Sequence, residues 1–309
     1  MEDADAVRAA FERDGFYIFR DLLDLSALAP AQQMLEAKVE AMAAELAAAR
    51  AAAGAPQRSD HADAPFASRW ARLARDFAAD CDAGLVEAEK LSLVSAGSWG
   101  RTEMLDVRTY ELITHETLLA VARQLLGPEV TVNGDYYFRP ALSDHILDWG
   151  LEFHQDSWNC KCRGALFALL ATAAEEAAAH VDGGDTLAKP LQQKVEGLQV
   201  LTLWLPLVPV DRTSGALSLV KGSHRLGKIW PATVPPEERS LDRKTTFSDL
   251  VPRPAVVGRD PSTEWGVSEN WPEGVGRYGD LVAAEMKPGD LMAFHNMILS
   301  TRQILHGGL

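Results

Sequence analysis

The sequence predicts an α+β fold in which helices come first and an antiparallel β core, closed or sandwiched, follows. Residues 26–53 are dense in Ala, Leu, Glu, Lys and Met, which are strong helix formers. From residue 130 onward, short runs of β-branched and aromatic residues alternate with turns that contain Gly and Pro. Helices followed by many short strands with irregular connections are typical of this fold class.

The N-terminal part is expected to be mainly helical, over residues 1–128. It begins with a short helix, an Asp14-Gly15 turn and an extended piece. The long helix over residues 26–53 ends at Gly54-Ala55-Pro56 and is followed by a polar loop. Two more helical segments are predicted, over residues 64–85 and 116–126.

The β core is expected over residues 129–309, and the whole chain, 1–309, is interpreted as one domain. Two stretches interrupt the core as insertions, residues 164–193 and 240–279. The first is rich in Ala and Leu and is interpreted as a helical hairpin or surface insertion, with a lid over the site as the alternative. The strands are predicted at residues 130–132, 136–138, around 154, and at 198–210, 216–220, 281–286 and 291–294.

Charge and cysteine content narrow the possible partners. Lys and Arg number 30 against 44 Asp and Glu, a net charge of −14, which attracts neither nucleic acid nor anionic lipid. The N-terminus is acidic, without a signal peptide, and no stretch is long and apolar enough to span a bilayer. The three cysteines, Cys81, Cys160 and Cys162, lack metal-ligand spacing. These features predict reduced thiols, a cytoplasmic location and a small-molecule partner; they do not predict an oligomeric state.

One short motif carries the chemistry. His154 and Asp156 lie two residues apart in a segment expected to be a strand, so their side chains share a face. One more histidine would complete a facial triad, the arrangement of two histidines and one carboxylate that holds non-haem Fe(II) and leaves open positions.

Four motifs in order resemble the phytanoyl-CoA dioxygenase family of Fe(II)- and 2-oxoglutarate-dependent oxygenases. They are residues 11–20, the run 153–158 around His154, the central segments 203–207, 214–217 and 221–225, and the Gly-Asp turn with its strand at 287–294. The resemblance implies a double-stranded β-helix, a cupin-like jelly-roll barrel with the N-terminal helices packed on it and the iron at its mouth. It also implies Fe(II), 2-oxoglutarate as cosubstrate, and hydroxylation of a small organic molecule as 2-oxoglutarate is decarboxylated to succinate. Because Asp156 is retained, hydroxylation is favoured over halogenation.

The third ligand departs from the family pattern. The family spacing places it at Ser300, and a hydroxyl is a poor substitute for imidazole. His306, within Leu305-His306-Gly307, is the favoured ligand, and His295 is a second candidate. The remaining alternative is a site without a distal ligand.

The cosubstrate site departs as well. Relatives place an Arg beyond the distal histidine to bind the far carboxylate of 2-oxoglutarate, but this sequence stops at Leu309, so either the chain is truncated or another cation serves. Arg139 is the substitute candidate, with a surface Arg as the plain alternative. Thr202 and Trp204 alternate with leucines on a strand expected to line the barrel, where they meet cosubstrate or substrate; for Trp204, core packing is the alternative.

Two other functional classes remain open. One is a non-catalytic jelly-roll member of the family with an incomplete metal site. The other is a cupin-like metalloenzyme that does not use 2-oxoglutarate.

Overall fold

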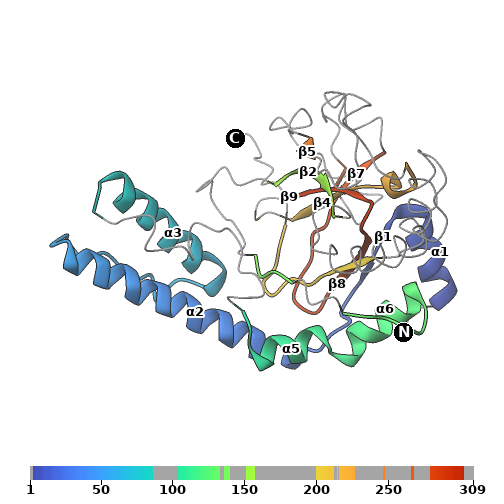
Figure 1. The fold of residues 1–309 in the computed structure, drawn as a ribbon, viewed down its shortest axis with the longest axis horizontal. Helices are drawn as coiled ribbons and strands as arrows, with labels where there is room; N and C mark the ends of the chain where they lie inside the picture. Colours follow the sequence, from blue (N-terminus) through green and yellow to red (C-terminus); the bar gives the residue numbers. More distant parts are fainter. Residues whose placement is uncertain are drawn as a thin grey trace, which may run out of the picture.

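The computed structural model describes residues 3–85, 104–132, 136–139, 151–156, 200–211, 214, 216–226, 246–247, 266–267 and 279–302. These form helices and two antiparallel sheets (Figure 1), so the predicted α+β class is confirmed. The helices are α1 (Ala4–Asp14), α2 (Leu25–Ala52), α3 (Phe66–Asp82), α5 (Val107–Ile113) and α6 (Glu116–Leu126), and a 3-10 turn, η3, covers Ser223–Leu226.

The smaller sheet has three strands in the order β1-β8-β3. They are β1 (Phe16–Phe19), β8 (Leu291–His295) and β3 (Leu201–Trp204). The larger sheet has the order β5-β2-β9-β4-β7-β6. Its strands are β5 (Thr246–Phe247), β2 (Leu151–Gln155), β9 (Leu299–Arg302), β4 (Leu217–Val220), β7 (Leu281–Ala283) and β6 (Gly266–Val267).

The three-stranded sheet lies between the helices and the six-stranded sheet. Side chains alternate along a strand, so each strand presents two faces. One face of the small sheet contributes to an inter-sheet cluster with strands of the large sheet: Phe16, Ile18, Trp204, Met292, Phe294, Leu217, Leu219 and Val282. The other face packs on α1, α2 and α6 through a second cluster: Phe19, Leu203, Leu291, Ala293, Val7, Leu28, Leu118 and Val121. The inter-sheet face is therefore the interior of the β core.

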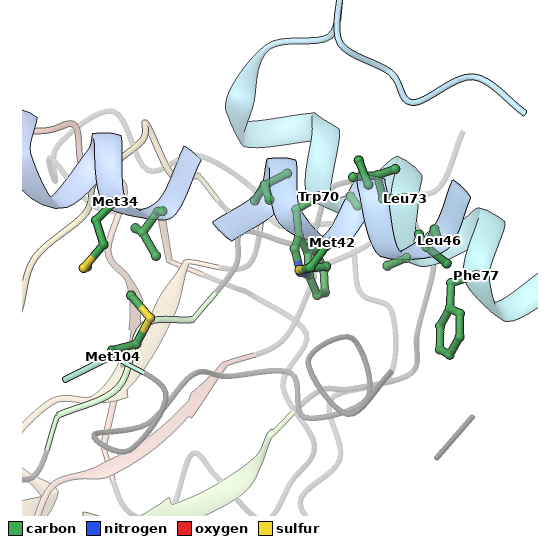
Figure 2. Packing of buried hydrophobic residues seen from close by; sticks show 12 residues of the cluster. Met34, Met42, Leu46, Trp70, Leu73, Phe77 and Met104 are labelled. Atoms are coloured by element: carbon green, nitrogen blue, oxygen red, sulfur yellow. The ribbon is translucent and has the colours of Figure 1, made fainter. Parts of the chain in front are cut away.

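Helices α2 and α3 lie side by side and extend away from the strands (Figure 1). Figure 2 shows the apolar contact between them, in which Met42 and Leu46 of α2 meet Trp70, Leu73 and Phe77 of α3. Met34 and Met104 continue this cluster toward α5. Among the described residues, no helix combines the length and apolar character needed to cross a bilayer.

A buried carboxylate fixes the turn that precedes β8. Asp290 is fully buried and accepts hydrogen bonds from the backbone N–H groups of Asp21 and Lys287 and from Arg20. Burial alone raises the pKa of a carboxyl group, but these donors outweigh it and hold the pKa of Asp290 below its usual value. The Gly-Asp turn therefore connects β8 to the chain that leaves β1.

Two strand predictions are wrong. Residues 130–132 are not a strand, and of 136–138 only Phe138 takes part in a β-bridge; Val132 and Tyr137 remain 46% and 44% exposed. Tyr136 and Phe138 are partly buried against the hydrophobic clusters, but Thr131 and Val132 are exposed. β propensity reflects burial and cross-strand packing more than the backbone itself, so composition alone did not make a strand of residues 130–132. Conversely, β5 and β6 are short strands within the segment 240–279, which was expected to interrupt the core as an insertion. The insertion expected at 164–193 lies outside the described residues.

Candidate metal centre

The end of strand β2 brings His154 and Asp156 together. Their closest ring nitrogen and carboxylate oxygen, Nε2 and Oδ1, are 3.4 Å apart. His154 is 9% exposed, and Asp156 follows immediately after the last residue of the strand. Two donors about 2.1 Å from one divalent ion, at neighbouring coordination positions, lie roughly 3 Å apart. The pair therefore fits two ligands of one metal ion.

Ser300 stands beside His154 on the neighbouring strand. The antiparallel register of β2 and β9 places the two residues directly opposite one another, so their side chains share a face. Ser300 is 2% exposed, and its Oγ donates to the carbonyl oxygen of His154 over 3.4 Å. The position at which family spacing puts the third ligand is thus next to the pair, and it holds a hydroxyl.

The described residues do not complete a three-ligand site. Within them, no group of three or more His, Cys, Asp or Glu side chains could hold a metal ion. His306, the favoured third ligand, lies outside the described residues. Within the described residues, the candidate metal ligands are His154 and Asp156.

His295 lies on a different face. Phe294 belongs to the inter-sheet cluster, so the next residue of β8 faces the helical side. There the His295 ring lies 5.3 Å from the His224 ring and 6.5 Å from the Phe11 ring, between centroids. Its Nδ1 accepts from the Met297 N–H, and burial, with His224 nearby, lowers the pKa of His295 to about 4. The structure does not bring this second candidate to His154 and Asp156.

Thr202 reaches Asp156 from the other sheet. It lies in β3 opposite Phe294, on the inter-sheet face, and its Oγ1 is 3.3 Å from Oδ2 of Asp156. Trp204, two residues along the strand, packs against the inter-sheet cluster. Both residues therefore face the interior of the core, as the alternation of this strand predicts.

Arg139 supplies positive charge near the same carboxylate. The residue is exposed, yet enough protein surrounds its guanidinium that desolvation lowers the pKa of Arg139, while the Asp156 carboxylate acts in the opposite direction. Its guanidinium carbon lies 5.6 Å from the centre of the Tyr137 ring. Within the part of the chain that the structure describes, no carboxylate forms an ion pair with Arg139.

A profile of the phytanoyl-CoA dioxygenase (PhyH) family matches residues 11–299. The chain belongs to this family. Membership makes it a 2-oxoglutarate-dependent oxygenase whose cofactors are Fe(II) and 2-oxoglutarate. The matched range contains His154, Asp156 and Thr202 and ends one residue before Ser300.

Two crystal structures of the epimerase SnoN are similar to the chain. One, in complex with Fe3+, alpha ketoglutarate and nogalamycin RO, shares 15% identity at a TM-score of 0.40, over 97% of this chain and 77% of SnoN. The other is described as a non-heme alpha ketoglutarate dependent epimerase from nogalamycin biosynthesis. It shares 13% sequence identity at a TM-score of 0.40, and the match covers 97% of this chain and 76% of SnoN. Comparison with curated proteins gives no match. The family assignment rests on the profile.

Two further residues of this PhyH member hold the segment before β9. Gln155 donates from Nε2 to the carbonyl of Met297 over 2.6 Å, and the fully buried Ser223 accepts from the Leu299 N–H over 2.8 Å. Both contacts secure the turn that leads to Ser300. The sequence pattern did not indicate Gln155. The available signal was its place in the strand between His154 and Asp156, where alternation points its side chain away from theirs.

Proposed function

We propose that this PhyH family member is a dioxygenase that hydroxylates a small organic molecule and converts 2-oxoglutarate to succinate. The observation that carries the proposal is the 3.4 Å contact between Nε2 of His154 and Oδ1 of Asp156, inside the range matched by the family. The proposed architecture is a single domain, residues 1–309, on a double-stranded β-helix. The proposed location is the cytoplasm, where cysteines such as Cys81 stay reduced.

The proposed metal ligands are His154, Asp156 and His306. Fe(II) bound with 2-oxoglutarate supplies the oxygen activation that hydroxylation requires. The chain's own contribution is to fix the donors: β2 holds His154 against β9, and Asp156 is tethered to β3. Thr202 shares its face of β3 with Trp204 of the apolar inter-sheet cluster, and this apolar surface would limit the access of water to that side of the site.

Arg139 is the proposed partner of the far carboxylate of 2-oxoglutarate. A guanidinium without an ion-pair partner among the described residues, close enough to Asp156 for its charge to be felt, can accept a bidentate carboxylate. Thr202 and Trp204 face the same interior and are proposed to flank the cosubstrate. Asp156 occupies the carboxylate position itself, which supports hydroxylation over halogenation.

Ser300 favours a second candidate. A buried hydroxyl opposite His154, where the family pattern puts an imidazole, is expected in a family member whose metal site is incomplete and whose jelly-roll binds a ligand without turnover.

Succinate formation tests the proposal. Purified protein with Fe(II), oxygen and 2-oxoglutarate should release succinate slowly even without its substrate, and His154→Ala and Asp156→Ala should abolish the release. His61→Ala is the matched control, because His61 pairs with Asp76 beside α3, away from the strands. Iron-loaded, folded protein that forms no succinate with any small-molecule pool would contradict the proposed activity and support the second candidate.

A further inference from the structure

We infer that Thr202 is a positioning residue that orients the Asp156 carboxylate for metal binding. The inference rests on the proposed function, because it takes His154 and Asp156 as metal ligands. It gives Thr202 a role distinct from contact with the cosubstrate.

The two carboxylate oxygens of Asp156 have different neighbours. Oδ1 lies 3.4 Å from Nε2 of His154, and Oδ2 lies 3.3 Å from Oγ1 of Thr202. The Thr202 hydroxyl donates to Oδ2, which directs the other oxygen toward the histidine. A carboxylate held in this way presents one oxygen at the shared metal position and resists rotation about its own axis.

Asp156 needs such an external tether because of where it lies. Strand β2 ends at Gln155, so the ladder of the large sheet stops one residue before the carboxylate. Among the described residues, only Thr202 donates a hydrogen bond to the Asp156 side chain. The orientation of this ligand therefore depends on a residue from the opposite sheet.

Thr202 is a rigid anchor. It lies inside β3, whose register with β8 is continuous from Leu201 to Trp204. A β-branched side chain in a strand has few χ1 rotamers, so the hydroxyl position is well defined. Thr202 is half-buried on the inter-sheet face opposite Phe294, and its hydroxyl donates to Asp156. Outer-shell contacts of this kind orient metal ligands in general.

The test compares Thr202→Val with Thr202→Ser by anaerobic titration of the full chain with Fe(II). Valine keeps the shape and removes the hydroxyl, so we expect Fe(II) affinity to fall roughly 10–100-fold, while serine restores affinity close to wild type. The matched control is Thr109→Val in α5, a fully buried threonine whose Oγ1 contacts Sδ of Met34. It should alter the thermal midpoint of the metal-free protein without altering Fe(II) affinity.

A double-mutant cycle separates positioning from general damage. In an Asp156→Asn background, Thr202→Val should cause little further loss of Fe(II) affinity, because the carboxylate through which it acts is gone. Equal Fe(II) affinity of wild type and Thr202→Val, or equal losses in both backgrounds, would overturn the role of Thr202 and leave the proposed function standing. Wild-type protein that binds no Fe(II) would instead overturn the proposed function, and the inference with it.

Discussion

At the scale of single residues, the least expected feature of the site is the hydroxyl of Ser300 opposite His154. The backbone register puts this side chain on the same face as the histidine, and the residue is almost fully buried. We propose that His306 supplies the third imidazole instead. Substitutions at Ser300 and at His306 should therefore have different effects on Fe(II) affinity.

We expect His306→Ala to weaken Fe(II) binding at least as much as the roughly 10–100-fold that outer-shell changes cost. Ser300→Ala should leave Fe(II) affinity unchanged, and Ser300→His should bring no gain, because the third position is already filled. Anaerobic Fe(II) titration of the three variants measures this. A clear gain with Ser300→His, together with no loss in His306→Ala, would show that the native site lacks a distal ligand.

A second residue-scale prediction concerns acid stability. Burial, with His224 nearby, lowers the pKa of His295 from 6.5 to about 4. Between pH 4 and pH 6.5, His295 is therefore protonated in the unfolded chain but neutral in the folded chain. The contribution of His295 to stability is therefore complete above about pH 6.5 and is lost as pH falls toward 4, up to about 3 kcal/mol. His224 is the titratable group that acts on His295, and the charges of Asp14 and Arg225 act in turn on His224.

Urea unfolding of wild type and His295→Asn across this pH range checks the prediction. Asparagine can still accept from the Met297 N–H but does not titrate. The difference in unfolding free energy between the two proteins should narrow as pH falls. A constant difference would mean that His295 is not held neutral by the fold.

At the scale of elements, the end of α1 depends on glycine. Gly15 caps the helix with φ +83°, and a Cβ there would lie 2.4 Å from Nδ1 of His224, in the turn η3. Gly15→Ala should therefore destabilise the protein by about 1–3 kcal/mol. Gly54→Ala, with φ +66° but nothing within 4 Å of the added Cβ, should cost about 1 kcal/mol. Equal losses in thermal or urea unfolding would refute the proposed contact between α1 and η3.

Local signals predicted α2 and α6 closely, whereas α5 was not predicted as a separate helix. The segment 116–126 is observed as α6 over Glu116–Leu126, because Gly127-Pro128 ends it and polar His115 caps it. The Ser26–Ala53 prediction differs from α2 by one residue at each end. Strand identity was less predictable, as residues 130–132 show, because a strand is stabilised by partners that lie far away in the sequence.

In the candidate site too, local relations could be predicted from sequence and long-range contacts could not. The short spacing of His154 and Asp156 predicted that they come together, and the alternation of β3 predicted that Thr202 faces the interior. The hydrogen bond from Thr202 to Asp156 joins two sheets across 46 positions of sequence, and the pairing of Ser300 with His154 depends on the register of β9. Neither relation has a local signature, so neither could be predicted from sequence.

At the scale of the whole molecule, the helices cover the outer face of the three-stranded sheet, and the inner face meets the six-stranded sheet (Figure 1). The proposed metal ligands His154 and Asp156 lie at the end of β2, and the hydrogen bond to Asp156 comes from Thr202 in the opposite sheet. The arrangement explains how a site can be assembled from short motifs that are far apart in the sequence. For the site to be catalytically active, it also needs a third metal ligand and a cation that binds 2-oxoglutarate.

The most direct test is an anaerobic titration of the purified chain with Fe(II) and then 2-oxoglutarate, monitored for the weak visible metal-to-ligand charge-transfer band. We expect the band to appear in wild type, to be lost in His154→Ala and His306→Ala, and to need much more 2-oxoglutarate in Arg139→Ala. Absence of the band in folded, iron-loaded wild-type protein would contradict the proposed site.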